Sequence, residues 1–259
     1  MNILIQDKPQ SSFSKAASSY EMASNLQKKI GLELLKSIPE DKNYVSVLDV
    51  GMGTGWLTER MGIKFPNAHI TGVDLAPGMI LKAQSKRIGT VLQADAQVLP
   101  FKDSHFDLII SNCAYQWVEK LDQAFCSSRR VLKDGGDFYF SCFGKETLRE
   151  LWTSLKTVSK DLILRDKRWE DIDKNHIFNA LAQSGFSDID VYSKVVKIEF
   201  DNMFDLIRWL KTIGANQVKR KAFVGRNILN QVNDFYQNQY RNADRIYASF
   251  EIIKAKARK

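Results

Sequence analysis

Near the start of the chain, apolar and small residues recur at a spacing that predicts an amphipathic helix. We expect this helix to run from about Tyr20 to Lys36, because Pro39 and the polar residues after it end the pattern. The positions that share the apolar face are Ala23, Leu26, Ile30, Leu34 and Leu35.

Further along, short apolar runs alternate with segments of helical pattern. Strands are predicted at residues 44–50, 69–75, 90–96, 106–112 and 137–143. Helices are predicted at residues 56–65, 77–87 and 121–132, with a turn at 133–136. Strands that alternate with helices in this way form βαβ units, and therefore a parallel sheet that is covered on both faces.

The last part of the chain adds two strands and two insertions. Residues 188–200 and 246–256 read as strands, so we expect an α/β fold with a doubly wound, mostly parallel, seven-stranded Rossmann-like sheet. Ligands of such a sheet bind beyond the carboxyl ends of its strands, where the insertions would form a helical lid. We expect a single domain over residues 1–259, with a helical cap at 13–45, a cofactor-binding core at 46–145 and lid insertions at 146–175 and 201–245.

Composition narrows the class of protein. No apolar run approaches the roughly 18 residues that a membrane span requires, and the polar start does not resemble a secretory signal. The 3 cysteines form no CxxC pair and the 3 histidines are scattered, so we expect no metal site and no disulfide framework. Such cysteine usage indicates a reducing compartment and a cytoplasmic protein.

The net charge of +8 is concentrated near the end of the chain. Residues 210–259 hold 11 basic and 3 acidic side chains, a net of +8. A basic surplus in one segment suggests that an acidic partner binds there. A solvated face with a basic tail would give the same count, so both interpretations stay open.

A glycine-rich turn follows the first predicted strand. Glycines in the run Asp49 to Gly55 let the backbone turn sharply and let a ligand lie against main-chain atoms. Asp74 ends the second strand about twenty residues later, where a carboxylate can accept both ribose hydroxyls of an adenosine. A plain tight turn, and a helix N-cap at Asp74, are the alternatives.

The spacing of the glycines separates two kinds of cofactor. Dinucleotide enzymes carry GxGxxG, whereas Gly51, Gly53 and Gly55 form GxGxG. S-adenosylmethionine (SAM) has no phosphate but has a methionine carboxylate, which a helix N-terminus favours, and an amine, which Asp49 could favour. The pattern therefore favours a methyltransferase over a dehydrogenase.

The third and fourth predicted strands also end in polar residues, which would lie at the same ligand-binding edge of the sheet. Asp95 closes the third strand, where it could accept from an adenine amino group, although an Asx turn would use the same residue. Asn112 closes the fourth strand and opens a polar and aromatic run that includes Gln116 and Trp117. A tryptophan is more often in a core than in a site, and here we expect Trp117 to serve both.

Five segments resemble the class I SAM-dependent methyltransferases: LDVGMGTG, GVDLAPGM, QADAQVLPF, FDLIISNCAYQW and RVLKDGG. Outside the cofactor half, the chain resembles the malonyl-acyl carrier protein O-methyltransferases of biotin synthesis from about Phe13 onward. The segments that carry this narrower resemblance are FSKAASSYEMASNLQKKIGLELL, SNCAYQWV, FSCFGKETLRELW, LKTIGAN and YASFEIIKAKARK. Asp134 departs from the family, which usually has proline in this turn.

The resemblance implies methyl transfer from SAM to the free carboxylate of malonyl-acyl carrier protein, giving a methyl ester that primes pimeloyl and biotin synthesis. A carboxylate is ionised at neutral pH, so the reaction requires no general base. The residues expected to bind SAM are Tyr20, Gln27, Asp49, Gly51, Gly53, Gly55, Asp74, Leu75, Met79, Asp95, Ala96 and Asn112. The candidates for positioning the substrate are Tyr20, Gln116, Trp117, Lys145 and Arg149.

Some of these assignments have simpler alternatives. Tyr20 and Gln27 could lie on an ordinary solvent-facing helix, and Lys145 and Arg149 could be surface charges. An acidic carrier protein would explain the basic segment, with docking candidates at Lys211, Lys219, Arg220, Lys221 and Arg226. A small-molecule methyltransferase, a nucleic-acid methyltransferase and a SAM-binding assembly factor remain alternatives, although no NPPY-like motif favours nucleic acid.

Overall fold

The computed structural model of the 259-residue chain describes residues 9–86, 88–158, 163–164, 171–215, 219–220 and 225–259. For residues 163–164 and 219–220 it describes the backbone alone.

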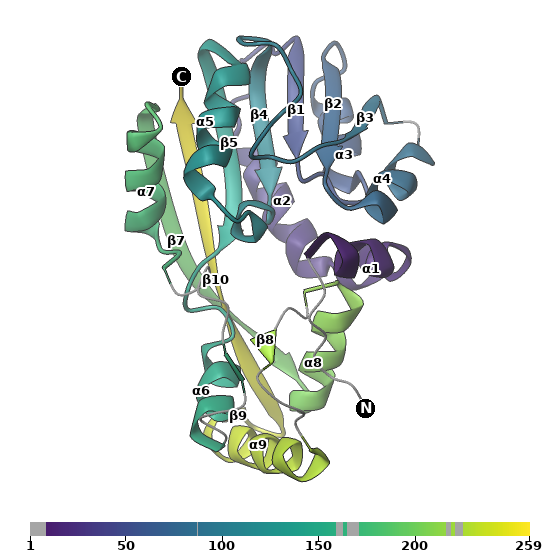
Figure 1. The fold of residues 1–259 in the computed structure, drawn as a ribbon, viewed down its shortest axis with the longest axis vertical. Coiled ribbons are helices and arrows are strands. Elements are labelled where there is room, and N and C mark those ends of the chain that lie inside the picture. Colours follow the sequence, from purple (N-terminus) through teal and green to yellow (C-terminus); the bar gives the residue numbers. More distant parts are fainter. Residues whose placement is uncertain (1–8, 87, 159–162, 165–170, 216–218, 221–224) are drawn as a thin grey trace.

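A twisted sheet forms the upper part of the molecule in Figure 1. Neighbouring strands follow the order β3-β2-β1-β4-β5-β10-β7, and the first five run parallel. β10 pairs antiparallel with β5 on one side and with β7 on the other. This arrangement confirms the predicted α/β class and the mostly parallel Rossmann-like sheet. The strands are β1 Ser46–Val50, β2 His69–Asp74, β3 Thr90–Gln93, β4 Phe106–Asn112, β5 Leu132–Phe143, β7 Ser187–Phe200 and β10 Arg245–Arg258, with the short β9 Arg241–Asn242 pairing only with β10.

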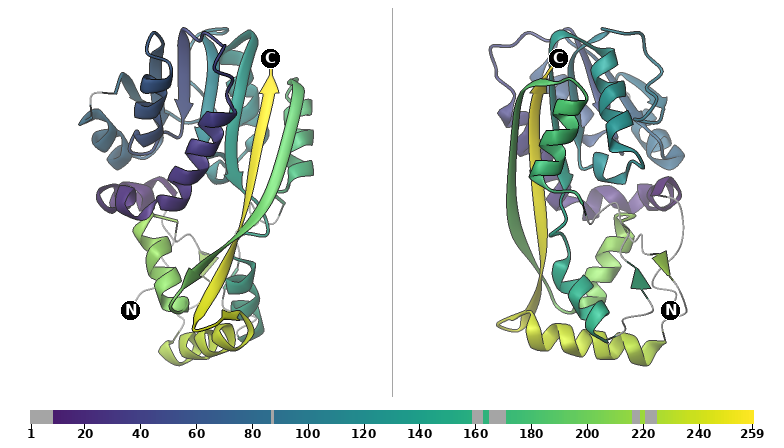
Figure 2. Two further views of the ribbon diagram at one scale, coloured as in Figure 1. Left: turned by 180° about the vertical axis from the view of Figure 1, so that it is seen from behind. Right: turned by 60° about the vertical axis from the view of Figure 1, so that its left-hand side comes forward.

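Helices cover both faces of the sheet because successive apolar side chains of a strand point to opposite sides. On one face, Val47 and Leu108 pack with α2 (Asn25–Ser37) and α3 (Trp56–Lys64). On the other face, Leu48 and Ile109 pack with α5 (Leu121–Val131) and α7 (Lys174–Gln183). These four strand side chains are fully buried, and the two layers are visible from behind in Figure 2.

The single helix predicted from about Tyr20 to Lys36 was wrong. Two helices occupy the region, α1 (Pro9–Ala23) and α2, and the backbone departs from helical geometry at Ser24. The carbonyl oxygen of Ala23 accepts the indole N–H of Trp209 at 2.8 Å. Because a distant side chain satisfies this carbonyl, the chain changes direction there without losing a hydrogen bond.

The turn predicted at residues 133–136 is part of β5. Phe106 of β4 pairs with Leu132, but Leu108 already pairs with Asp137, so extra residues bulge out between the two pairs. Gly135 lies in this bulge with a φ of 76°, a left-handed conformation that glycine adopts without strain.

The two insertions lie together beyond the carboxyl ends of the parallel strands (Figure 1). The first contains α6 (Arg149–Val158) and β6 (Ile163–Leu164), and the second contains α8 (Met203–Thr212), β8 (Lys219–Arg220) and α9 (Arg226–Gln239). β6 pairs with β8, and α6 packs against α9. We call this assembly the lower lobe. Its apolar core also includes side chains of β10, which runs from the lobe into the sheet.

Within the described ranges, no helix is both long and apolar enough to cross a membrane. In the same ranges, no group of three or more histidine, cysteine, aspartate or glutamate side chains could hold a metal ion.

Candidate active site

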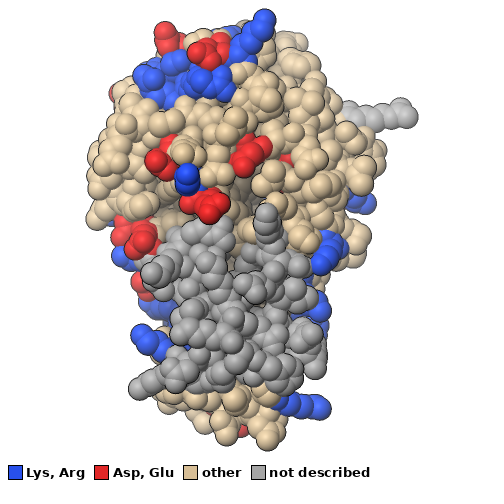
Figure 3. All heavy atoms as spheres, in the orientation of Figure 1, with Lys and Arg blue, Asp and Glu red and all other residues tan. Residues whose placement is uncertain are grey.

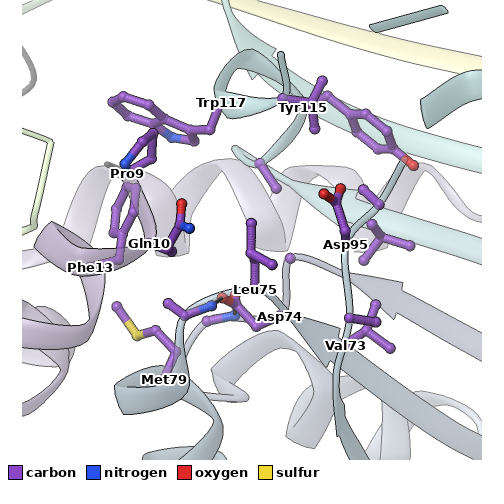
Figure 4. A pocket seen from close by; sticks show the side chains of 18 of the residues that line it. Pro9, Gln10, Phe13, Val73, Asp74, Leu75, Met79, Asp95, Tyr115 and Trp117 are labelled. Atoms are coloured by element: carbon purple, nitrogen blue, oxygen red, sulfur yellow. Dashed lines mark hydrogen bonds between the residues drawn. The ribbon is translucent and has the colours of Figure 1, made fainter. Parts of the chain in front are cut away.

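A cavity of about 700 Å³ opens at the carboxyl edge of the sheet. Its walls come from the turn after β1, the end of β2, the loop after β3, the residues after β4, and α1 with α4 (Pro77–Gln84) (Figure 4). This volume is in the range of sites that enclose a cofactor. Nine of the residues predicted to bind SAM line it: Tyr20, Gly51, Gly53, Asp74, Leu75, Met79, Asp95, Ala96 and Asn112.

The glycine turn presents bare backbone to this cavity at Gly53. Its φ is 58°, and a Cβ built there would meet no atom within 4 Å. A Cβ at Gly51 would instead lie 2.2 Å from the Cβ of Ala114. Gly53 therefore leaves room for a ligand, while Gly51 allows the neighbouring loop to approach. Gly55 does not line the cavity; its Cβ would collide with Ile88, so it serves packing.

Asp74 lies at the end of β2 and faces the cavity (Figure 4). Its Oδ2 accepts the backbone N–H of Gly53 and its Oδ1 accepts that of Ala76, each at 2.8 Å. Burial raises the pKa of Asp74, although the N–H groups of Ala76 and Gly53 oppose the shift. The carboxylate thus joins the glycine turn to the start of α4 and keeps lone pairs for ligand hydroxyls.

Asp49 lies behind the turn and not at the cavity. Its side chain is buried and its Oδ2 accepts the hydroxyl of Thr58 at 2.7 Å. Burial raises the pKa of Asp49 to about 7; Thr58 lowers it and the nearby Asp74 raises it further. Asp49 can therefore influence a cofactor through the turn, but its own side chain does not line the cavity.

Asp95 and Asn112 line the cavity and also make local hydrogen bonds. Asp95 Oδ1 accepts the backbone N–H of Gln97 at 2.9 Å, so the residue forms an Asx turn and also lines the cavity. Asn112 donates to the carbonyl oxygen of Gln27 at 2.9 Å and accepts the hydroxyl of Ser141 at 2.8 Å. The Asn112 side chain therefore joins α2 to the sheet.

A second, smaller cavity of about 40 Å³ adjoins the first. Tyr20 and Trp117 line both cavities, whereas Gln27 and Gln116 line only the small one. Burial raises the pKa of Tyr20, and the nearby Cys113 and Asp74 raise it further. The phenol therefore stays protonated and can donate a hydrogen bond. Burial also raises the pKa of Cys113 to about 12, which argues against a thiolate nucleophile.

Lys145 and Arg149 line neither cavity. Lys145 forms an ion pair with Asp173 at 2.7 Å. Arg149, with its side chain half exposed, pairs with Glu146 and with the buried Glu150 at 3.2 Å. That either residue anchors a substrate carboxylate stays a prediction, and the geometry of the cavities does not support it.

Sequence reasoning missed the contribution of the first turns of α1. Pro9, Gln10 and Phe13 line the large cavity, and the ring of Phe13 meets that of Trp117 edge to face at 5.2 Å (Figure 4). α1 is described from Pro9 onward, and proline is favoured near the start of a helix and disfavoured in its interior. That preference was a usable signal that a helix begins before Tyr20.

The electrostatic character of the large cavity is acidic. Asp74, Asp95 and Glu119 line it, and in the described part of the chain no lysine or arginine lines either cavity. Figure 3 shows mostly acidic side chains in the middle of this face, and a larger gathering of basic side chains, with acidic ones beside them, at the upper end of the sheet. A ligand with a positive charge and hydrogen-bond donors suits this site. SAM fits, because it has a sulfonium, an ammonium, ribose hydroxyls and an adenine amino group.

We compared the chain with protein families and with solved structures to identify its fold. Residues 48–140 match the family described as a methyltransferase domain. A putative methyltransferase from Bacillus halodurans superposes with a TM-score of 0.63 at 17% identity, over 88% of this chain and 98% of that one. Phosphoethanolamine N-methyltransferase 2 of Haemonchus contortus, solved with SAM, gives 0.61 at 19% identity, over 95% and 57%. The fold is the Rossmann-like fold of methyltransferases.

Curated relatives define the family more narrowly. The malonyl-[acyl-carrier protein] O-methyltransferase of Geobacter sulfurreducens is 31% identical over 95% of this chain and 96% of its own length. That of Methylococcus capsulatus is 31% identical over 94% and 90%. The biotin biosynthesis bifunctional protein BioHC of Cellvibrio japonicus is 29% identical over 93% of this chain and 48% of its own. The chain belongs to the malonyl-[acyl-carrier protein] O-methyltransferase family.

Proposed function

We propose that this protein transfers the methyl group of SAM to the free carboxylate of malonyl-acyl carrier protein, giving the methyl ester that primes pimeloyl and biotin synthesis. The observation that carries the proposal is that the similarity to the Geobacter enzyme covers 95% of the chain. A coverage this large extends well beyond the part common to methyltransferases, residues 48–140, and into the lower lobe, which supplies walls of the small cavity.

The described residues of the large cavity can hold the cofactor without a lysine or arginine. Gly51 and Gly53 would let it lie on the backbone, and Asp74 would accept its ribose hydroxyls. Asp95 would accept the adenine amino group, with Leu75, Met79 and Ala96 as the apolar surface beside the base. Tyr20 closes the cavity from α1, while Asp49 and Gly55 support the turn from behind.

Bound SAM would supply a methyl group on a sulfonium, which the malonyl carboxylate oxygen would take up while the electron pair of the carbon–sulfur bond would remain on sulfur. The protein does not need to remove a proton, because the malonyl carboxylate is already ionised. Its contribution is to exclude water and to hold the oxygen in line. Tyr20 and Trp117 lie at the junction of the two cavities, where they would position it.

The absence of lysine and arginine from the described walls of both cavities suits this chemistry. A guanidinium or ammonium paired with the carboxylate would draw electron density from the attacking oxygen. Uncharged donors hold the oxygen more weakly, so more of its nucleophilicity is kept in a site that excludes water.

Mass spectrometry of carrier proteins tests the proposal directly. Malonyl-carrier protein incubated with SAM should gain about 14 Da, one CH₂, and acetyl-carrier protein should gain nothing, since a site for a carboxylate rejects a substrate without one. Methylation of the acetyl form, or none of the malonyl form, would contradict the proposed reaction.

The acyl carrier protein would dock on the lower lobe. Lys211 in α8 and Arg226 in α9 are exposed there. Lys219 and Arg220 form β8, for which the backbone alone is described, and Lys221 lies outside the described residues. Carrier proteins are acidic, and complementary charge would speed the encounter and orient the acyl arm toward the cavities.

A further inference from the structure

The small cavity lies on the side of Trp117 that faces the lower lobe. Its walls come from α1, α2, the 3-10 turn η1 (Tyr115–Trp117), α8 and β10, and most of its lining is aromatic or aliphatic. It shares Phe13, Tyr20, Cys113 and Trp117 with the large cavity, so the two spaces adjoin. A group that extends from the large cavity toward the lobe would enter it.

Two glutamines that line this apolar space have unpaired acceptors. The Oε1 atoms of Gln27 and Gln116 are buried without a hydrogen-bond partner, and both residues line the small cavity. Among the described residues only two other buried side-chain atoms share this condition, on Ser111 and Tyr139. An unpaired buried acceptor is costly, so two in one small cavity point to a ligand that donates there.

The orientation of the Gln116 amide is fixed. Its Nε2 donates to the carbonyl oxygen of Cys113 at 2.7 Å, and a flipped amide would put two oxygens in contact. Cys113 is itself held, because its backbone N–H donates to the carbonyl oxygen of Ser141 at 2.9 Å. The acceptor of Gln116 therefore cannot find a partner by rotating, and a donor must come to it.

The chemistry of the donor can be deduced from the proposed function, on which this step rests. The malonyl carboxylate is ionised and has no hydrogen to donate. The arm that carries an acyl group as a thioester has two methylenes after the sulfur and then an amide N–H. The two methylenes of this arm match the apolar walls of the small cavity, and its amide N–H matches the unpaired acceptor among them. We infer that the small cavity recognises this thioester arm, with its first amide N–H donating to the Oε1 of Gln116 and with Gln27 as a second acceptor.

The same arm occurs in carrier proteins and in coenzyme A, so the inference concerns the arm and not the protein attached to it. It also assigns Gln27 to the substrate and not to SAM. The volume of about 40 Å³ exceeds the space that one water needs, roughly 10–15 Å³, and suits a small planar group.

A one-atom change in the substrate tests the inference. The malonyl thioester of N-acetylcysteamine carries the N–H, and the S-(4-oxopentyl) thioester replaces that NH by CH₂ and keeps the carbonyl. With wild-type protein, kcat/KM should favour the amide by about 10-fold, the value of one hydrogen bond to a buried acceptor. Each of Gln116→Leu and Gln27→Leu should reduce this preference, and the double variant should abolish it.

Two readouts separate this role from others. The Kd of S-adenosylhomocysteine should stay within about 2-fold of wild type in the leucine variants, and Gln183→Leu, at an exposed position of α7, should keep the full preference. The inference is overturned if wild type shows no preference, if the double variant retains it, or if cofactor affinity falls instead. If the leucine variants have a raised Tm and an unchanged preference for the amide thioester, the side-chain carbonyls of Gln27 and Gln116 contact only water, and the inference is rejected.

Failure of the proposed function would be recognised separately, since wild type would then methylate neither thioester. In that case the acetyl forms of the two thioesters are titrated into the complex with S-adenosylhomocysteine. Tighter binding of the amide in wild type, lost in the double variant, supports the recognition of the arm, and equal binding rejects it.

Discussion

Two carboxylates flank the glycine turn, and their surroundings give them different tasks. Asp74 faces the large cavity and is held by two backbone N–H groups. Asp49 is buried behind the turn, with the Thr58 hydroxyl as its hydrogen-bond donor. The first is placed to contact a ligand, whereas the second can act only through the fold and its own ionisation.

Replacing Asp74 by asparagine should weaken the binding of S-adenosylhomocysteine by about 30-fold or more, because hydrogen bonds to an ionised acceptor are the stronger ones. An asparagine has only one acceptor oxygen for the two N–H groups that Asp74 now accepts. Titration calorimetry measures the loss of affinity. Asp103→Asn is the control, since that side chain is 74% exposed and distant from the cavity lining. Equal affinities of the two variants would remove Asp74 from the site.

Asp49 should make the stability of the protein depend on pH. Its pKa is about 7 in the folded protein against 3.8 for a free side chain, so the folded state binds more protons between these values. Stability should therefore fall as the pH rises from about 4 to 7, and then level off. In Asp49→Asn this component should vanish, and urea unfolding at several pH values checks it. Parallel pH profiles for wild type and variant would contradict the raised pKa.

Where it depends on local contacts, sequence spacing predicted which residues lie together at the large cavity. Gly53 and Asp95 follow β1 and β3, Asp74 ends β2, and the carboxyl ends of parallel strands meet at one edge. Which groups face the cavity could not be read in the same way. Gly55 contacts Ile88 and Arg149 pairs with a buried glutamate, and both outcomes depend on packing between separate elements.

At the scale of elements, apolar runs correctly predicted seven strands of the main sheet, but not the two-residue strands β6, β8 and β9. A strand covered on both faces needs apolar side chains throughout, whereas a two-residue strand leaves no such pattern. The break between α1 and α2 was not predictable from local pattern. It depends on the indole of Trp209, which lies 186 positions away in the sequence. Tertiary contacts of this kind override the helical periodicity of the segment that receives them.

The placement of α1 over the cavity can be tested at Gly78. A Cβ there would lie 2.4 Å from the backbone oxygen of Ser14, so Gly78→Ala should push α1 away from α4. Because α1 carries Phe13 and Tyr20 into the cavity, affinity for S-adenosylhomocysteine should fall about 10-fold or more. Proteolysis within α1 should become faster.

Gly62 provides the matched control for this substitution. It also lies in a helix, α3, but its Cβ would meet only Ile70 at an ordinary 3.9 Å. Gly62→Ala should leave cofactor affinity unchanged and raise stability by up to about 1 kcal/mol through helix propensity. If the two alanine variants bound cofactor alike, contact between α1 and α4 would not matter for the site.

At the scale of the whole molecule, the basic surplus and the acidic cavity lie in different places. Lys211→Glu combined with Arg226→Glu should raise KM for malonyl-carrier protein by about 10-fold and leave malonyl-CoA unaffected, because only the carrier protein presents an acidic surface. The KM of wild type for the carrier should also rise with ionic strength. Steady-state kinetics with both substrates checks the difference.

Lys102→Glu controls for the change in net charge, since this exposed lysine lies between β3 and β4, outside the lower lobe. It should leave both KM values close to wild type. Equal increases for carrier protein and coenzyme A substrates would place the effect of the lobe variants in the cavities and not in docking.

The position of β10 also dictates when the fold can be completed. β7 precedes β10 along the chain, yet β10 lies between β5 and β7 and pairs with both. During synthesis, β7 consequently waits without a neighbouring strand while α8, β8 and α9 are translated, and its fourteen residues are a transient site for misassociation. When β10 is added, it joins β7 to the preceding sheet in a single late step. Folding intermediates should therefore be distinguished by whether β10 is paired with β5 and β7.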